Sequence, residues 1–554
     1  MSGDGSSIGD LAFPVTHGEL VRRLGSPMQQ KRFRRKRFTA FGTALALVAA
    51  AVLTFVTYLP NLRCDWGSTG LEMAGGECVG VDDGSHSFDP GLDWITGRIH
   101  SMNRKVEERL ENDGDLKAFR IVLMTSFSLS GDADLDQSQI ERAVEGAYAS
   151  LMRQNGFAEN TDGSLETVAE GSRLFQLYLA NEGSLQQGAD VVVEQLEDMK
   201  GDEIPLSAVI GQSSTTTATE SIARDLSERG IPMIASSSTS TTINNDDFPG
   251  LIRVAPNNED YAAAIRGRLD AEDEAGRDPG RGMLLFDDNR EDIFASDLAF
   301  QFEEYLDPYL VEHRRSFTGS AGREKSPVYF DHIINEICGR NAPDMVFFAG
   351  RFSYLEDFLH AWELRGCRTP DGDPITVYSI EIGLHPGIIG DYATECGAAE
   401  DEPAPGDFRL MQASAFDPAW LEEGGWRPEG FDVYREAMTG TVRGESQSTG
   451  SESDFYNGYS LIYYDAADIA VRATLLGHEA GDEDTLAESV RNHLFRVSGE
   501  QTGSGYLDFV EELDGRVTGR YVPIVSFPCV EAPSATVPFQ TPDEPYDELY
   551  PDLK

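Results

Sequence analysis

Basic side chains are scarce in this sequence, and their scarcity excludes one class of partner. The 554 residues include 45 Lys and Arg against 95 Asp and Glu, which sets the net charge at −50 at pH 7. A chain this acidic repels phosphate backbones, so we expect no nucleic-acid partner. Such acidity is typical of a solvated surface that keeps a protein soluble, and it identifies no ligand.

Catalytic motifs are missing as well. The sequence contains no P-loop, no G-x-S-x-G and no H-E-x-x-H. Its nine histidines are scattered, and His332, His360 and His385 have no Cys or Ser nucleophile at a recognisable spacing. We interpret them as surface or packing residues and expect neither an enzyme nor a cofactor.

Charge is absent from one long segment, Phe38–Leu59, whose 22 residues follow the basic run Lys31–Arg37. At about 1.5 Å per residue this segment spans a bilayer core of ~30 Å. The positive-inside rule then places the N-terminus in the cytoplasm and the chain after Pro60 outside the cell. A cleaved signal peptide is the alternative, but its apolar core is shorter, ~7–15 residues, and ends at a small-residue cleavage site. Here Arg63 directly precedes Cys64, so we predict a retained single-pass anchor in the cell membrane.

Cysteines are few, even in number and all on the expected outer side, which favours disulfides. None stands in a C-x-x-C spacing or is followed by a nearby histidine ligand pattern, so we expect no zinc site or other metal site. Cys64 and Cys78 would close a small loop. Cys338 and Cys367 each precede an expected strand, and parallel neighbours would bring them close. Cys396 and Cys529 remain as a third pair by subtraction only.

Hydrophobic residues are not scarce, at 40% of a chain long enough for two or three folded domains. Apolar runs of strand length alternate with amphipathic stretches of helical period, which predicts parallel sheets covered by helices. There are too many strands for one open sheet, so we expect an α/β protein with two lobes. The expected elements are 93–111, 119–124, 138–154, 174–180, 189–199, 207–210, 217–229, 231–235, 282–286, 297–305, 344–349, 354–364 and 375–380.

Two expected strands, Ala208–Ile210 and Ile231–Ala235, each run directly into a cluster of serines and threonines. Ligands of open parallel sheets bind beyond the carboxyl ends of the strands. The loops Gln212–Thr216 and Ser236–Thr242 would lie side by side there, and the first also opens a helix whose N–H groups attract anions. The pair therefore suits a carboxylate or another small anion. Helix capping is the alternative, since Ser and Thr are common caps.

The segment IGQSSTTTATESIARDLSERGIPMIASSSTS resembles the amino-terminal lobe of the type I periplasmic-binding-protein fold, in the branched-chain amino acid (Leu/Ile/Val) binding family. The segments LIRVAPNNEDYAAAI, DDNREDIFASDLA, MVFFAG, YYDAADIA and TGSGYLDFVEELDGRV resemble further family motifs in the same order. The resemblance covers roughly Ala118 to Pro528. It implies two doubly wound parallel-sheet lobes joined by a hinge, here preceded by one transmembrane helix.

The resemblance also implies ligand-binding residues. Ser213, Ser214, Ser238 and Thr239 would hold an α-carboxylate, and Glu381 would meet the ammonium group. Phe294 takes the place of a family tyrosine, and Arg351 stands where the family has another. Each of the last three has a plainer interpretation: Glu381 as a surface acid, Arg351 as the partner of an acid such as Glu356, and Phe294 as core packing.

The expected organisation is a cytoplasmic tail, an anchor, an extracellular stalk with a helix, two lobes of two segments each and an acidic Pro-rich tail. The corresponding residues are 1–37, 38–59, 60–117, 118–255 with 409–495, 256–408 with 496–530, and 531–554. We expect a membrane-tethered solute-binding protein that passes an amino acid or a small carboxylate to an ABC-type permease. A sensor that signals through a membrane or cytoplasmic partner, or a scaffold or adhesion module without a ligand, is the alternative.

Overall fold

A computed structural model describes most of the chain after residue 70. The described residues are 64, 70–128, 135–160, 162–212, 215–311, 314–320, 328–339, 342–367, 372, 374–384, 408–421, 425–442, 455, 457–481, 485–497, 499–509, 515, 517–518 and 521–527. The chain divides into two units, Met1–Gly67 and Ser68–Lys554, and both lobes belong to the second. Within the described residues no helix has both the length and the apolar character of a membrane span, and the expected anchor at Phe38–Leu59 lies outside them.

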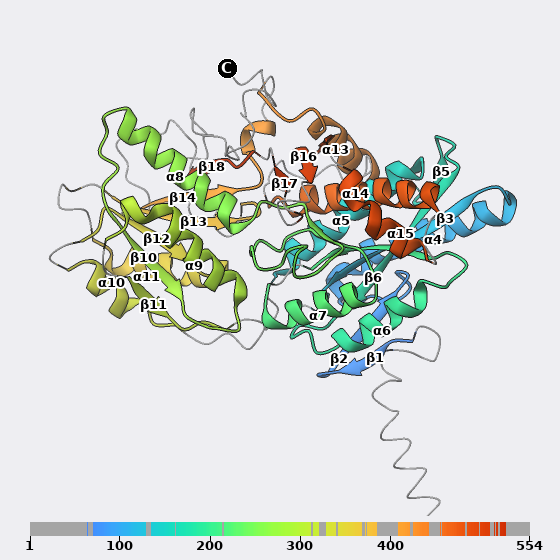
Figure 1. The fold of residues 1–554 in the computed structure, drawn as a ribbon, viewed down its shortest axis with the longest axis horizontal. Helices are drawn as coiled ribbons and strands as arrows, with labels where there is room; N and C mark the ends of the chain where they lie inside the picture. Colours follow the sequence, from blue (N-terminus) through green and yellow to red (C-terminus); the bar gives the residue numbers. More distant parts are fainter. Residues whose placement is uncertain are drawn as a thin grey trace, which may run out of the picture. The chain divides into compact units, whose positions relative to one another are not determined.

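The first lobe is built on a sheet of seven described strands in the order β1-β2-β6-β3-β7-β8-β9 (Figure 1). Strands β6, β3, β7, β8 and β9 run parallel, and the β1–β2 hairpin joins the edge of β6 in the antiparallel direction. The bounds are β1 Glu72–Ala74, β2 Glu77–Asp82, β3 Lys117–Thr125, β6 Arg173–Asn181, β7 Leu206–Gly211, β8 Met233–Ala235 and β9 Leu251–Arg253.

Helices cover both faces of this sheet, which is why its central strands are apolar on both sides. One face packs against α4, α5, α14 and α15, and the other against α6 and α7. The bounds are η1 Pro90–Leu92, α4 Asp93–Asn112, α5 Gln137–Gln154, α6 Ala189–Met199, α7 Thr217–Glu228, η3 Pro418–Leu421, α13 Phe431–Ala437, η4 Met438–Val442, α14 Tyr459–Ala480, α15 Leu486–His493 and η7 Leu494–Arg496, with a small hairpin of β4 Phe157–Glu159 and β5 Leu165–Thr167.

The second lobe holds a sheet of six described strands in the order β11-β10-β12-β13-β14-β18, of which only β18 is antiparallel to its neighbour. Helices α10 and α11 pack on one face, and α8 and α9 pack on the other. The bounds are α8 Asn258–Glu274, β10 Gly282–Asp287, α9 Ile293–Leu306, η2 Asp307–Tyr309, β11 Arg315–Phe317, α10 Asp331–Ile337, β12 Met345–Ala349, α11 Phe352–Arg365, β13 Ile375–Glu381, β14 Phe408–Ser414 and β18 Ile524–Phe527.

The chain passes from one lobe's core to the other's at three places in the described residues. The first lies between β9 and α8, the second after β14, and the third between Tyr521 and Val522. Several short crossings of this kind allow two lobes to move as rigid bodies about a hinge. The α/β class and the two lobes expected from the sequence are confirmed, with sheets that are mixed and mostly parallel.

Two expected boundaries differ from the structure. Strand β14 pairs with β13 along its whole length, so residues 408–414 belong to the second lobe. The small sheet of β15 Glu500–Thr502, β16 Gly505–Phe509 and β17 Val517–Thr518 packs on the first lobe instead, where Leu507 and Val517 are buried. Its turn is held by Asp465 of α14, which accepts the Gly503 N–H at 2.8 Å.

Residues 72–82, expected to be part of a stalk, instead form strands β1 and β2 at the edge of the first sheet. The composition suggested a stalk because it is rich in Gly and Asp, but Val79 and Val81 are buried against the lobe. Pairing between β2 and β6 joins residues about a hundred positions apart, and no local period reports such a contact.

The expected disulfide between Cys338 and Cys367 is confirmed, with 5.5 Å between the two Cα atoms. The bridge joins the C-terminal end of α10 to the residues just after α11. Cys64 and Cys78 are each disulfide-bonded. Cys396 and Cys529 lie outside the described residues.

Candidate functional site

Strand β7, helix α7 and strand β8 form a parallel βαβ unit, as expected, and bring their two polar loops into contact. The Thr215 and Ser238 hydroxyl oxygens are 3.0 Å apart, and the Gly211 N–H donates to the Ser236 hydroxyl at 3.1 Å. Thr215 is 3% exposed and Ser238 is fully buried. We call residues 212, 215–217 and 236–242 the first-lobe edge. Ser213 and Ser214 lie outside the described residues.

Helix α7 begins with a side-chain cap at this edge. The Thr216 hydroxyl accepts the N–H groups of Ala218 and Thr219 at 3.2 and 3.4 Å and donates to the Gln186 side-chain oxygen at 2.7 Å. The N–H of Thr217, the first residue of α7, donates to the Glu291 carbonyl of the second lobe at 3.3 Å. The amides at this helix N-terminus are therefore already engaged by the chain itself.

The second lobe contributes the loop after β10 to this contact. Thr216 and Asp292 form an isolated antiparallel bridge, and the Phe294 N–H donates to the Thr215 carbonyl at 3.1 Å. Asp292 also caps α9, since its carboxylate accepts the Ala295 N–H at 3.1 Å. The loops that the sequence expected on two different lobes thus meet through main-chain hydrogen bonds.

Arg351, at the start of α11, completes the contact with a buried ion pair. Its guanidinium donates to both carboxylate oxygens of Asp292, at 2.7 and 3.0 Å, and a further N–H reaches the Thr215 carbonyl at 3.4 Å. Asp292 is fully buried and the Arg351 side chain is 14% exposed. The guanidinium also lies 5.4 Å from the centre of the Phe294 ring, which packs against the second-lobe core.

Glu381 ends β13 and contacts the first lobe through α14. Its carboxylate accepts the Ile382 N–H at 3.0 Å and the Tyr459 hydroxyl at 3.3 Å. Burial raises the pKa of Tyr459 well above its ordinary value, and the negative charge of Glu381 adds to the rise. Tyr459 stacks on Tyr463, whose hydroxyl is 3.2 Å from that of Ser237, so Glu381 connects back to the first-lobe edge.

The last two site residues expected from the sequence lie in the loop after β8. Ser238 pairs with Thr215, as described, and the Thr239 carbonyl accepts the N–H of Asn258 at 2.7 Å. The same loop is tied to α9 by Asp297, which accepts the Thr241 N–H at 2.9 Å and the Thr241 hydroxyl at 2.6 Å. Ser238, Thr239, Phe294 and Arg351 therefore belong to one connected set of contacts.

Sequence reasoning missed four members of this set: Asp292, Asp297, Tyr459 and Tyr463. Asp292 directly precedes the apolar residues Ile293 and Phe294, the position of an N-cap, and this signal could have marked it as the cap of a helix. Tyr459 and Tyr463 stand four residues apart, which places them on one face of a helix. Asp297 is bonded to Asn258 and Gln301 of its own lobe as well as to Thr241 of the first lobe, and the contact with Thr241 carries no local signal.

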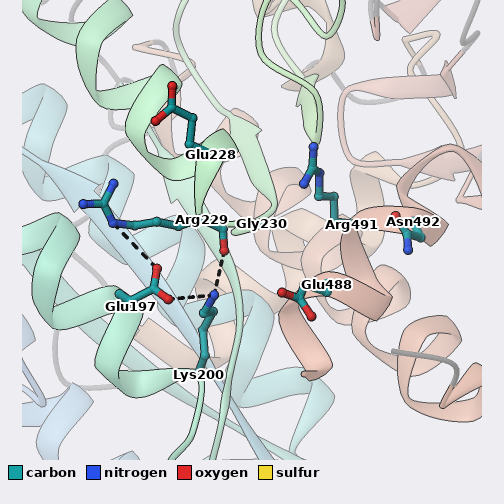
Figure 2. A pocket seen from close by; sticks show the side chains of 8 residues that line it. All are labelled: Glu197, Lys200, Glu228, Arg229, Gly230, Glu488, Arg491 and Asn492. Atoms are coloured by element: carbon teal, nitrogen blue, oxygen red, sulfur yellow. Dashed lines mark hydrogen bonds and ion pairs between the residues drawn. The ribbon is translucent and has the colours of Figure 1, made fainter. Parts of the chain in front are cut away.

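A separate pocket of about 600 Å³ lies at the opposite end of α7. Figure 2 shows its lining, in which most side chains are charged: Glu197, Lys200, Glu228, Arg229, Gly230, Glu488, Arg491 and Asn492. Lys200 donates to the Arg229 carbonyl at 2.6 Å and lies 3.0 Å from Glu197. Helix α7 is about 18 Å long at 1.5 Å per residue, so this pocket is remote from the loops at its other end. Glu197 is paired with both Lys200 and Arg229, and we do not assign the pocket a ligand. Among the described residues no group of His, Cys, Asp and Glu side chains is arranged to hold a metal ion.

No family model and no curated protein matches this sequence. Solved structures of low sequence identity do resemble the fold. An ABC transporter substrate-binding protein from Desulfitobacterium hafniense, in complex with Leu, is 15% identical and aligns over 74% of this chain and 97% of its own, with a TM-score of 0.49. A leucine-binding protein from Thermotoga maritima is 14% identical over 74% and 95%, also at 0.49. A solute-binding protein of an ABC transporter from Rhodopseudomonas palustris, in complex with p-hydroxybenzoic acid, is 12% identical over 74% and 92%, again at 0.49.

Proposed function

We propose that this chain is a solute-binding protein that takes up a small carboxylate ligand, an amino acid or a related compound, between its two lobes. The observation that carries the proposal is the direct contact of the first-lobe edge with the loop after β10, centred on Thr215. Buried hydroxyl groups and two lobes joined by three crossings provide polar recognition and a means of closing over a ligand.

Ligand binding requires the lobes to separate, because the chain now occupies the groups that would hold a carboxylate. The Thr217 N–H is bonded to the Glu291 carbonyl, and Arg351 reaches the Thr215 carbonyl. Hydrogen bonds of this kind exchange partners at little net cost, since each contributes only about 0.5–1.5 kcal/mol. Opening about the hinge would release them, and an anion would take their place.

We assign roles to the site residues within this proposal. Ser213, Ser214, Ser238 and Thr239 hold the carboxylate, and Glu381 holds the ammonium group of an amino acid. Phe294 lines the site from the second lobe. Arg351 is bonded to Asp292 and acts by positioning the loop after β10, rather than by binding a second anionic group of the ligand.

Thermal unfolding of the purified full-length chain tests the proposal. The standard L-amino acids and p-hydroxybenzoic acid are screened one by one, and we expect at least one to raise the melting temperature, because a ligand that binds only the folded state stabilises it. The shift should vanish in Ser213→Ala/Thr239→Ala and shrink in Glu381→Gln. Each lost hydrogen bond to a charged group, about 1.5–3 kcal/mol, weakens binding roughly 10- to 100-fold.

Ser221→Ala is the matched control, since this serine is exposed on α7 and bonds only the carbonyl of its own helix. It should leave the shift unchanged. No shift with any compound would leave the chain a scaffold or adhesion module. An equal shift in the double variant would place the ligand elsewhere.

We also propose that Phe38–Leu59 anchors the protein in the cell membrane with its lobes outside, and that an ABC-type permease receives the ligand. The uncharged segment and its basic flank support the anchor. Protease added to intact cells should remove the lobes and leave a small membrane fragment. Full-length protein that resists the protease would contradict this orientation. Cells without the chain should lose uptake of the compound found in the screen, whereas unchanged uptake would favour a sensor.

A further inference from the structure

Two residues other than glycine adopt a left-handed backbone in the described part of the chain: Gln186, with φ of 55°, and Gln212, with φ of 56°. L-residues other than Asn and Asp rarely adopt this conformation, because Cβ approaches the following carbonyl oxygen. Both glutamines lie at the carboxyl ends of first-lobe strands, Gln186 in the loop after β6 and Gln212 directly after β7. Unfavourable backbone of this kind is retained where neighbouring contacts or function require it.

The contacts of Gln186 account for its conformation. Its side-chain oxygen accepts the Thr216 hydroxyl at 2.7 Å, and its amide nitrogen donates to Glu182 and Thr219, both at 3.1 Å. The Gln186 side chain therefore supports the cap of α7, and the left-handed backbone of Gln186 has a structural role.

The contacts of Gln212 do not account for its left-handed backbone. The residue is 4% exposed, yet neither its amide nitrogen nor its amide oxygen has a hydrogen-bond partner among the described residues. Its main-chain N–H donates to the Met124 carbonyl at 3.1 Å. A buried amide without partners opposes folding, and most buried polar groups in proteins are paired.

The turn itself does not require a glutamine. A Cβ on the preceding Gly211 would lie 2.2 Å from the Met124 carbonyl oxygen, so the close approach to β3 depends on that glycine. At position 212, Gly or Asn would adopt a positive φ with less strain. The chain instead carries a longer side chain with one donor group and one acceptor group.

Gln212 also begins the first of the two loops that form the first-lobe edge. It directly precedes Ser213 and Ser214, and Gly211 exchanges two hydrogen bonds with Ser236, the first residue of the other loop. We propose that Gln212 is a ligand-contacting residue whose buried amide selects a ligand group that both accepts and donates a hydrogen bond. This inference rests on the proposed function of the same site.

The hydrogen-bonding groups of the Gln212 amide indicate which class of ligand group it would bind. The Nε2 atom needs an acceptor and the Oε1 atom needs a donor. The carboxylate and ammonium of a zwitterionic amino acid supply both within one small group. A plain carboxylate supplies only the acceptor and leaves Oε1 unpaired, so Gln212 favours amino acids over aromatic acids such as p-hydroxybenzoic acid.

Three variants of the full-length chain test the proposal: Gln212→Gly, Gln212→Asn and, as the matched backbone control, Gln186→Gly. Without ligand, both Gln212 variants should keep the wild-type melting temperature or exceed it by roughly 1–3 °C, because strain and an unpaired amide are removed. Gln186→Gly should melt lower, because it loses the bonds that support the cap. Binding of each standard L-amino acid and of p-hydroxybenzoic acid is then measured by calorimetry.

We expect the affinity of Gln212→Gly for the bound amino acid to fall about tenfold or more, and its preference over p-hydroxybenzoic acid to fall with it. Asn, one methylene shorter, should lose nearly as much. Unchanged amino-acid affinity in Gln212→Gly would overturn this inference alone and leave the proposed function intact. A lower ligand-free melting temperature in both Gln212 variants would also overturn it, since the side chain would then serve the fold. If the wild-type chain binds none of the compounds, the proposed function fails and this inference fails with it.

Discussion

The two lobes present opposite chemistry where they meet. The first-lobe edge is neutral, built from Thr and Ser hydroxyls and from main-chain amides. The second lobe presents charges, and these are already paired, Arg351 with Asp292 and Glu381 with the Tyr459 hydroxyl. Neutral groups exchange hydrogen-bond partners cheaply, whereas breaking a buried ion pair is costly. Under the proposed function, ligand would therefore exchange at the first-lobe edge, and the second lobe would supply a preformed surface that closes over it.

The largest expected loss of stability comes from breaking the buried ion pair between Arg351 and Asp292. Arg351→Met leaves the Asp292 carboxylate buried without its cation, and we expect a loss of about 3 kcal/mol or more in the free energy of unfolding. Adding Asp292→Asn should restore part of that loss, because the second change removes the uncompensated charge and keeps an acceptor for the α9 cap. Denaturant unfolding of the two variants measures both values.

Glu220→Gln is the control for this pair. Glu220 bonds Arg224 at 2.8 Å on the exposed surface of α7, with both side chains in solvent. Such pairs contribute less than about 1 kcal/mol. If Glu220→Gln lowers the free energy of unfolding as much as Arg351→Met does, the idea that the second-lobe charges hold their loops in place is wrong.

A smaller loss of stability is expected from a change in the neutral first-lobe edge. Thr216→Ala removes the cap of α7 and its bond to Gln186, which should cost about 1–2 kcal/mol. Thr216→Ser keeps the hydroxyl and should recover most of it. The measurement is again the free energy of unfolding. If Thr216→Ala costs more than Arg351→Met, then the first-lobe edge is the more rigid of the two, and the assignment of ligand exchange to it is wrong.

The smallest effect concerns pH. Burial raises the pKa of Asp287, at the end of β10, and the charges of Asp292 and Asp288 add to the rise, while the N–H groups of Gly319 and Asn289 oppose it. Because the folded state holds this proton more tightly than the unfolded state, the stabilising contribution is present below the unfolded pKa of about 4 and is lost as the pH rises through the folded value. Asp287→Asn should therefore gain stability relative to wild type between about pH 4 and pH 7.

Asp162 provides a comparison, because its pKa is lowered and its effect on the pH dependence of stability has the opposite sign. The hydroxyl and N–H of Ser164 lower its pKa, so its contribution is present above the unfolded pKa and is lost in acid. Asp162→Asn should lose stability relative to wild type as the pH rises from the folded pKa to the unfolded value of about 4, and the difference should stay nearly constant above it. Unfolding curves of wild type and both variants at several pH values decide the matter, and three parallel pH profiles would contradict both assignments.

Local patterns in the sequence predict many of the elements and their order. Helix α6 occupies the expected residues 189–199, and β7, α7 and β8 lie within one or two residues of expectation, because a local period reports which face of an element is buried. The adjacency of the two hydroxyl loops also followed, since a βαβ connection places consecutive parallel strands side by side. The Cys338–Cys367 bridge followed from the same local order.

The partners of individual side chains depend on the folding of the chain over long distances in the sequence. The plainer interpretation of Arg351 gives it a neighbouring acid such as Glu356 as a partner, whereas the guanidinium is bonded to Asp292, 59 residues earlier. Glu381 and Tyr459 are 78 residues apart, and Asp297 and Thr241 are 56 apart. Contacts across such separations depend on where the chain crosses between the lobes, and the periodicity of a single helix or strand contains no information about that path.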